Sequence, residues 1–199
     1  MSKTTKVILI IVAVVLVIGI WMASIYNRMV REEEKVSSAW AQVESVYQRR
    51  ADLIPNLVRT VQGAADFERG TLESVIEARS QATSVTVDPN NLTEANIAAF
   101  QNAQANLTSA LNRLMVVVER YPELKANQNF LELQAQLEGT ENRINVERQK
   151  FNETVQTYNA YIRGFPKNMI AGMFGFEKKA YFQAEAGAEQ APDVQFDFN

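Results

Sequence analysis

A run of twenty residues without a charge, 7–26 (VILIIVAVVLVIGIWMASIY), constrains the fold of this chain more than any other feature. The hydrocarbon layer of a bilayer is about 30 Å thick, and a helix that rises about 1.5 Å per residue crosses it in about 20 residues. Trp21 and Tyr26 stand near the C-terminal end of the run, where aromatic rings favour the headgroup layer. The run is longer than the apolar region of a cleaved signal peptide, about 7–15 residues, and it lacks a good small-residue cleavage site. We therefore expect a retained transmembrane helix over 7–26, preceded by a polar segment over 1–6.

Histidine and cysteine are both absent from the 199 residues. Their absence excludes disulfides, thiolate and imidazole metal ligands, thiol nucleophiles and histidine general bases. The net charge of −3, without a basic block, argues against a nucleic-acid-binding surface. The sequence contains no glycine-rich phosphate loop and no nucleophile elbow. We predict no cofactor, no metal site and no catalytic residue, so that the chain is not an enzyme; a carboxylate-based enzyme is a remote alternative.

The membrane helix has no residue after Tyr26 that would stop it, because residues 27–50 contain neither proline nor glycine. One apolar stripe at heptad spacing follows, formed by Val36, Trp40, Val43 and Tyr47. We expect a helix over 27–50 that continues the transmembrane helix. The segment 51–55 (ADLIP) then predicts a turn, in which Asp52 caps a second helix over 53–83. A continuous helix kinked at the proline is the alternative.

Two further helices are predicted by apolar residues that recur every three or four positions, over 93–120 and 127–163. A loop with the turn residues DPNN precedes the first of them, and Tyr121-Pro122 ends it. Four amphipathic helices joined by short connections indicate an all-α fold. We predict an antiparallel four-helix bundle of long helices over 27–164, whose first helix is continuous with the transmembrane helix.

The C-terminal tail, 165–199, is expected to be mostly irregular, but its first half is unusually rich in phenylalanine, methionine and tyrosine. Disordered tails are poor in aromatic residues, so we expect this half to pack on the bundle. Asn152 and Asn159 lie seven residues apart beside aromatic residues of the last helix. Their amides are placed to bond either into the tail or into other helices.

Two groups of charged residues are candidate sites. The first is an interaction tip at the far end of the bundle, formed by Arg49, Arg50 and Asp52 at the predicted turn. Arginines beside a helix N-terminus suit a phosphate or a headgroup, while helix-dipole partners and local salt bridges are the alternative. The second is a structural polar layer between the helices, for which a solvated helix face is the alternative. Its predicted members are Arg79, Glu119, Glu141, Asn142, Arg143 and Arg148.

Short blocks along most of the chain carry a resemblance to a known family. They are AWAQVE (39–44), RRADLIPNLV (49–58), EAR (77–79), ERYPELKAN (119–127), TENRI (140–144) with Arg148, YN (158–159), and FP, FGF and YF within 165–182. In this order they resemble the LemA family of bacterial single-pass membrane proteins. The resemblance implies a short N-terminal segment, a membrane helix and a helical bundle, and it supplies no catalytic residue and no established molecular function. Family members are described beside a membrane-embedded zinc protease, and relatives occur in magnetosome membranes.

The leading functional interpretation is a membrane-anchored helical scaffold or interaction protein of the bacterial cell envelope. A membrane-shaping or lipid-contacting module, whose tail folds onto the bilayer, is the alternative. The predicted partners are the lipid bilayer through 7–26 and unidentified envelope proteins, with a membrane protease and a second copy of the chain among the candidates. Lysines and arginines flank 7–26 almost evenly, and the outward N-terminus that the family implies favours a bundle in the cytoplasm.

Overall fold

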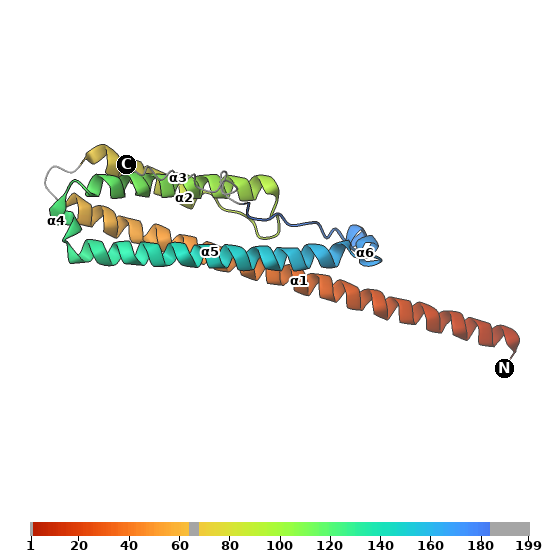
Figure 1. Cartoon of the computed structure of the whole chain (residues 1–199). Helices are drawn as coiled ribbons and strands as arrows, with labels where there is room; N and C mark the ends of the chain where they lie inside the picture. The colour runs from red at the N-terminus through yellow and green to blue at the C-terminus, as the bar shows by residue number, and fades with distance from the viewer. Residues whose placement is uncertain (1, 64–67, 184–199) are drawn as a thin grey trace, which may run out of the picture.

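The structure, a computed structural model, describes residues 2–63 and 68–183 and is entirely helical, with no strand in these ranges. Its helices are α1 (Lys3–Gln62), α2 (Arg69–Ser84), α3 (Glu94–Val118), α4 (Pro122–Lys125), α5 (Gln128–Arg163) and α6 (Lys167–Phe174). Successive long helices reverse direction, and the short α4 turns the chain at the end far from the N-terminus (Figure 1). The all-α fold predicted from the sequence is confirmed.

The helix α1 is a single rod of 60 residues, roughly 90 Å long at about 1.5 Å per residue. Its N-terminal part extends beyond every other helix (Figure 1). The side chains of this part are exposed, Ile20 to 71% and Val17 to 66%, because no other element covers them. Within the described residues, α1 is the one helix long and apolar enough to cross a membrane. We call the end of the bundle beside this apolar part proximal and the opposite end distal.

The turn expected at 51–55 is wrong, because α1 continues through Pro55 to Gln62. Asp52 is exposed and accepts a hydrogen bond from Gln48 Nε2 at 2.8 Å, so it caps no new helix. The apolar stripe simply continues beyond the proline. Its later members are Ile54, Leu57, Val58 and Val61, all buried. Burial of this stripe against the other helices outweighs the one backbone hydrogen bond that proline removes.

The second bundle helix is consequently shorter than the expected 53–83. The end of α1 takes the first part of that range, and α2 has only 16 residues. The helices α3 and α5 lie where helices over 93–120 and 127–163 are expected. Since α2 ends at Ser84, four long helices (α1, α2, α3 and α5) form the distal half of the bundle and three of them (α1, α3 and α5) continue into the proximal half.

The core is divided in the same way. In the distal half, α1, α2, α3, α4 and α5 enclose a cluster that includes Leu57, Leu114 and Phe130. In the proximal half, α1, α3 and α5 enclose a second cluster around Trp40, and the chain's own tail fills the place of the missing helix. The tail contains α6, which the sequence does not predict, followed by an extended segment over 176–183 that we call the strap. The strap inserts Phe182, 4% exposed, into the proximal core.

Candidate functional site

The surface of the bundle is hollowed by a groove between α3 and α5, which we call the α3/α5 groove. It arises because α1 packs along α5 and α2 packs along α3. Two hollows of about 420 and 210 Å³ follow one another in it, and Arg50, Thr108 and Glu141 line both. These three residues come from α1, α3 and α5, so all three helices meet at the midpoint of the groove.

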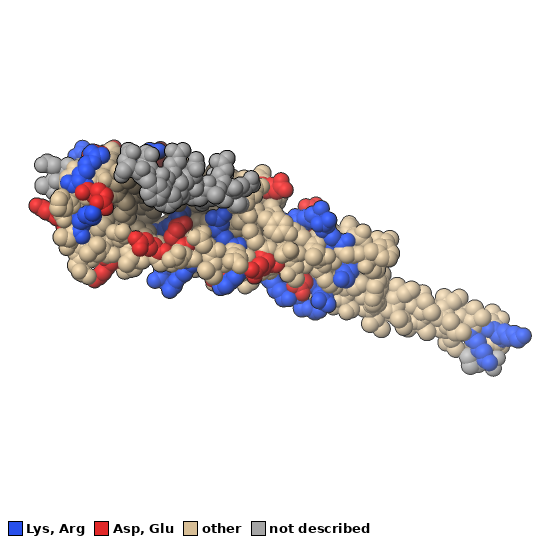
Figure 2. All heavy atoms as spheres, viewed as in Figure 1, with Lys and Arg blue, Asp and Glu red and all other residues tan. Residues whose placement is uncertain are grey.

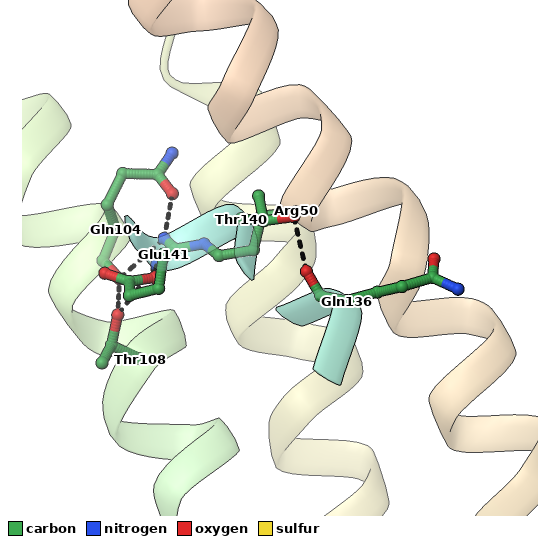
Figure 3. Close-up of polar contacts among 6 residues, drawn as sticks. All are labelled: Arg50, Gln104, Thr108, Gln136, Thr140 and Glu141. Atoms are coloured by element: carbon green, nitrogen blue, oxygen red, sulfur yellow. Dashed lines mark hydrogen bonds and ion pairs between the residues drawn. The ribbon is translucent and has the colours of Figure 1, made fainter. Parts of the chain in front are cut away.

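Arg50 is the centre of the polar contacts at this midpoint. It is 2% exposed, yet its guanidinium is well paired. Nη1 donates to Glu141 Oε2 at 2.9 Å and to Thr108 Oγ1 at 3.1 Å, and Nη2 donates to Gln104 Oε1 at 2.6 Å (Figure 3). Its Nε is buried without a partner among the described residues. Because Glu141 is 45% exposed on its side chain, the pair joins a buried cation to a carboxylate at the groove wall.

Two other polar residues complete the midpoint. Gln104 is 6% exposed, and its Nε2 donates to the carbonyl oxygen of Ala82 at 3.1 Å, which ties α3 to the end of α2. Thr140 is also buried, but its hydroxyl donates to the carbonyl oxygen of Gln136 in its own helix at 2.7 Å (Figure 3). Gln104 and Thr140 therefore have satisfied hydrogen-bonding groups, as buried polar side chains normally do.

The residues of the predicted interaction tip do not lie at the distal end of the bundle. With α1 unbroken, Arg49, Arg50 and Asp52 lie within the rod, and the distal end is formed instead by Gln62, Gly63 and α4. Arg49 and Asp52 face solvent, whereas Arg50 points into the bundle. The expectation of an exposed arginine pair is wrong because it depended on a turn that does not form.

The predicted polar layer is partly right. Glu141 bonds across the bundle as expected, although to Arg50, and Arg79 donates from Nε to the carbonyl oxygen of Ala51 at 2.7 Å. The other predicted members lie elsewhere. Glu119 pairs with Lys125 at the distal surface, Asn142 and Arg143 face solvent, and Arg148 lies over the ring of Phe182. Gln104 and Thr108 were missed, although Gln104 occupies a position on the apolar stripe of 93–120, which is the signal that marks it as buried.

The strap occupies the proximal end of the same groove, held there by two asparagines of α5. Asn159 exchanges two hydrogen bonds with the backbone of Lys179, from Nδ2 to O at 2.8 Å and from N to Oδ1 at 3.0 Å. Asn152 makes the same pair with Phe182, at 3.0 and 2.9 Å. Seven helical residues span about 10.5 Å and three extended residues about 10 Å, so the two clamps stay in register. The alternative in which these asparagines bond into the tail is confirmed.

Phe182 anchors the strap in an aromatic cluster contributed by three helices. Its ring stacks on Trp40 of α1, with centroids 5.7 Å apart and an interplanar angle of 15°. It meets Phe151 of α5 and Phe100 of α3 edge-on, at 5.4 and 6.4 Å. Full burial of such a ring contributes about 1.5–3 kcal/mol. The strap therefore stabilises the proximal half by burying apolar side chains where a fourth helix would otherwise pack.

Two buried polar groups hold the proximal part of the strap. Lys179, 7% exposed, pairs with Glu33 at 2.7 Å and donates to the carbonyl oxygen of Asn90 at 2.9 Å. The hydroxyl of Tyr158 donates to the carbonyl oxygen of Glu177 at 3.0 Å. Burial, reinforced by the carboxylates of Glu33 and Glu177, raises the pKa of Tyr158 above its usual range. The strap thus connects α1, α5 and the loop before α3.

The described part of the strap reaches the larger hollow of the groove. Gln183, the last described residue, lines the larger hollow, and its carbonyl oxygen accepts hydrogen bonds from Gln101 Nε2 and Arg148 Nη2, both at 3.0 Å. Beyond it, the walls offer amide and hydroxyl side chains together with charged and apolar ones. Among residues 2–63 and 68–183, no group of three acidic side chains is placed to hold a metal ion. The geometry is therefore suited to hydrogen bonding with a backbone.

Comparison with known proteins gives a consistent set of relatives. A sequence model of the LemA family matches residues 39–196. The chain is 25% identical over 181 residues to the magnetosome proteins MamQ 1 and MamQ 2 of Paramagnetospirillum magneticum, a match that covers 82% of this chain and 66% of each relative. It is 24% identical over 158 residues to protein LemA of Metamycoplasma hominis, covering 79% of this chain and 68% of that protein. The chain thus spans about two thirds of the length of these relatives.

Proposed function

We infer that this chain, which belongs to the LemA family, is a membrane-anchored helical scaffold of the bacterial cell envelope that binds extended segments of partner proteins in the α3/α5 groove. One observation carries this inference: the proximal end of the groove already holds an extended segment, the strap, through side-chain amides and an aromatic pocket. The open part continues in line with it from Gln183. We assign the protein a binding role, without catalysis and without nucleic acid.

The walls of the open part repeat the chemistry that holds the strap. Asn102 of α3 lines the larger hollow, and Asn112 of α3 and Gln134 of α5 line the smaller one. Each amide offers a donor and an acceptor, which is what one residue of an extended backbone requires. Apolar side chains are also available for the partner's side chains in the smaller hollow. They are Leu111, Met115 and Leu137.

The unbroken α1 supports the scaffold part of the proposal. A bundle tethered by a flexible linker would rotate freely, but here the apolar segment and the groove midpoint at Arg50 lie on one helix. About 24 residues separate Tyr26 from Arg50, so the midpoint lies roughly 36 Å from the end of the apolar segment along the helix axis. Partners bound in the groove would be held at a set height from the membrane.

We further propose a single membrane pass with the bundle on the cytoplasmic side. The lysines and arginines on the two sides of the apolar segment are almost balanced, so the orientation is proposed from the outward N-terminus that the family resemblance implies. Envelope proteins, a membrane protease among them, are the candidate partners. The MamQ relatives are named as magnetosome proteins, which is consistent with a role in assemblies on membranes. Because the chain has no cysteine, Ser38→Cys would give a unique thiol on the exposed surface, and labelling by an impermeant reagent in intact cells would contradict the cytoplasmic side.

Photocrosslinking in cells tests the groove itself. A benzophenone amino acid replaces Asn102, which is exposed and lines the groove, and in a matched variant it replaces Ile76 on α2, 48% exposed and outside the groove. We expect adducts with partner proteins from position 102 and few from position 76. Equal yields from both positions, or no increase in mass at position 102, would contradict the proposal.

A chain that ends at Gln183 makes the test sharper. It keeps every strap contact described above and removes residues 184–199, so that binding by the groove is measured without them. Partner adducts from position 102 should persist or increase in this shorter chain. Their loss would mean that residues 184–199, and not the groove, recruit the partner.

A further inference from the structure

The short helix α6 presents an unusually apolar face to its surroundings. Phe165 is 82% exposed, Met169 66%, Met173 69% and Phe174 51%. Ile170 and Ala171 of α6 are buried against the bundle, 5% and 4% exposed. Met169 and Met173 lie one turn apart on the side that faces away, while Phe174 lies at the end of the buried side and stays half exposed. The helix is therefore packed on one side and presents methionine side chains on the other.

This face lies at the level of the membrane segment of α1. The ring of Phe174 meets Tyr26 edge-on, with centroids 4.9 Å apart. Phe174 also lines a hollow of about 390 Å³ together with Gly19 and Met22 of α1. Gly19 lies seven residues before Tyr26, about 10 Å deeper along the helix axis. In Figure 1, α6 lies beside α1 at the point where the rod leaves the bundle.

Basic side chains surround the same region. Arg28 of α1 and Lys167 of α6 both lie over the ring of Tyr161, at 4.9 and 4.1 Å from its centroid. No carboxylate in the described ranges pairs with either of them. Figure 2 shows lysines and arginines, with acidic residues among them, where the bundle meets the rod, and an uncharged rod beyond them up to its N-terminal lysines. We call Arg28 and Lys167 the basic collar. As cations without a carboxylate partner in the described ranges, they suit the anionic phosphates of lipid headgroups.

We propose that α6 is a membrane foot, which inserts its apolar face into the interfacial layer of the same bilayer that α1 crosses, with Arg28 and Lys167 at the headgroup phosphates. The bilayer is the occupant we assign to this face, because Phe174 lies beside Met22 of the apolar segment. Anything that covers Phe174 at that level must itself lie within the membrane interface. A short amphipathic helix with lysine and arginine at its polar border is the form that interfacial helices take. The foot would give the protein two points of attachment and set the tilt of the bundle.

This proposal rests on the membrane anchoring in the proposed function, so the test separates the two. The chain has no cysteine, and single cysteines carrying an environment-sensitive fluorophore can therefore be placed at will. Met173→Cys reports on the foot, Val15→Cys on the anchor, and Leu131→Cys, an exposed apolar site on α5, serves as the distal control. The full-length protein is reconstituted into vesicles of phosphatidylcholine that contain lipids with nitroxide quenchers at shallow or deep positions.

The foot predicts strong quenching of the label at position 173 by the shallow quencher, of position 15 by the deep quencher, and of position 131 by neither. Quenching at position 15 but not at 173 would overturn the foot and leave the anchor intact. Failure at position 15 would overturn the anchor itself. A blue-shifted but unquenched label at position 173 that reverts on dilution would show that a second copy covers this face, which would also overturn the proposal.

The basic collar gives a second readout. Addition of phosphatidylglycerol to the vesicles should increase the quenching at position 173 at least twofold. In a variant that combines Arg28→Gln and Lys167→Gln, this increase should be absent. The matched variant Arg69→Gln with Arg120→Gln, which removes two charges from the distal half, should keep it. An increase that survives the loss of Arg28 and Lys167 would contradict their assignment to the headgroups.

Discussion

Arg79 on α2 donates a hydrogen bond from Nε to the carbonyl oxygen of Ala51 on α1, at 2.7 Å. Ala51 lies four residues before Pro55, and proline has no N–H to give to that carbonyl. Arg79 therefore replaces the hydrogen bond that Pro55 removes from α1. The contact explains how α1 continues through a proline. It also connects two of the sequence blocks, because Ala51 belongs to RRADLIPNLV and Arg79 to EAR.

This contact predicts that the effects of Arg79 and Pro55 are coupled. Arg79→Met should lower the free energy of unfolding by about 1–2 kcal/mol, because it leaves the buried Ala51 carbonyl without a donor. In a Pro55→Ala background the helix supplies that donor itself, and the same substitution should cost less than half as much. Equilibrium denaturation of the full chain in mild detergent, followed by circular dichroism, measures both. An equal cost in the two backgrounds would show that Arg79 acts independently of the proline.

Substitutions of the adjacent Arg49 and Arg50 of α1 should affect the stability of the protein to very different extents. Arg50→Lys keeps the charge, but one ammonium cannot reach Glu141, Thr108 and Gln104 together as the planar guanidinium does. We expect Arg50→Lys to lower the free energy of unfolding by about 1–2 kcal/mol. The loss is not larger because Glu141 is partly exposed, so water weakens its ion pair with Arg50. Arg49→Lys, at an exposed position next to it, should change stability by less than about 0.5 kcal/mol. The same denaturation measurement compares the two, and similar losses would contradict the role given to Arg50.

The two asparagine clamps predict a local effect on the strap. Asn159→Ala leaves the buried backbone N–H and carbonyl of Lys179 unpaired, and should cost about 1–3 kcal/mol. Hydrogen exchange of the peptide that covers 176–183 should accelerate in Asn152→Ala and in Asn159→Ala. In Asn106→Ala, an exposed position on α3, it should not change. Unchanged exchange in the clamp variants would mean that the apolar contacts of Phe182 alone hold the strap.

The ionisation of Tyr158 should make the free energy of unfolding depend on pH in the alkaline range. Burial, with Glu33 and Glu177 nearby, raises the pKa of Tyr158 in the folded protein, whereas in the unfolded chain it ionises near pH 10. The folded state therefore retains a proton that the unfolded chain loses, and its stability falls as the pH rises above about 10, by up to about 1.4 kcal/mol per unit. Tyr158→Phe should show a shallower alkaline loss, and Tyr161→Phe should follow the original protein. Parallel curves for Tyr158→Phe and the original protein would contradict this assignment.

Much of the fold follows from periodicity in the sequence. The apolar run, the continuous first rod and the positions of α3 and α5 are properties of single helices, which local spacing encodes directly. The register of the clamps is also visible, since Asn152 and Asn159 repeat at seven residues. The turn at 51–55 was predicted wrongly, because Asp52 and Pro55 are local stop signals and the hydrogen bond that overrides them comes from Arg79, 28 residues along the chain.

The candidate site is less visible in the sequence for a related reason. The inward direction of Arg50 depends on the phase of an uninterrupted α1, so a predicted break placed it at a tip. The groove exists because α1 packs along α5 and α2 packs along α3, and this pairing of helices is tertiary. Two buried polar residues, Gln104 and Thr140, stood on apolar stripes and were the available sequence signal for a polar midpoint.

One rigid helix carries the groove at a set distance from the apolar segment. Spin labels on cysteines at Ile20 and Asn56, both exposed on α1, test this directly by pulsed electron–electron double resonance of the full chain in lipid nanodiscs. We expect a narrow distance distribution centred at roughly 54 Å, the length of 36 helical residues, extended only by the label side chains. A broad distribution, or one centred well below that length, would show a hinge between the anchor and the bundle and contradict the claim.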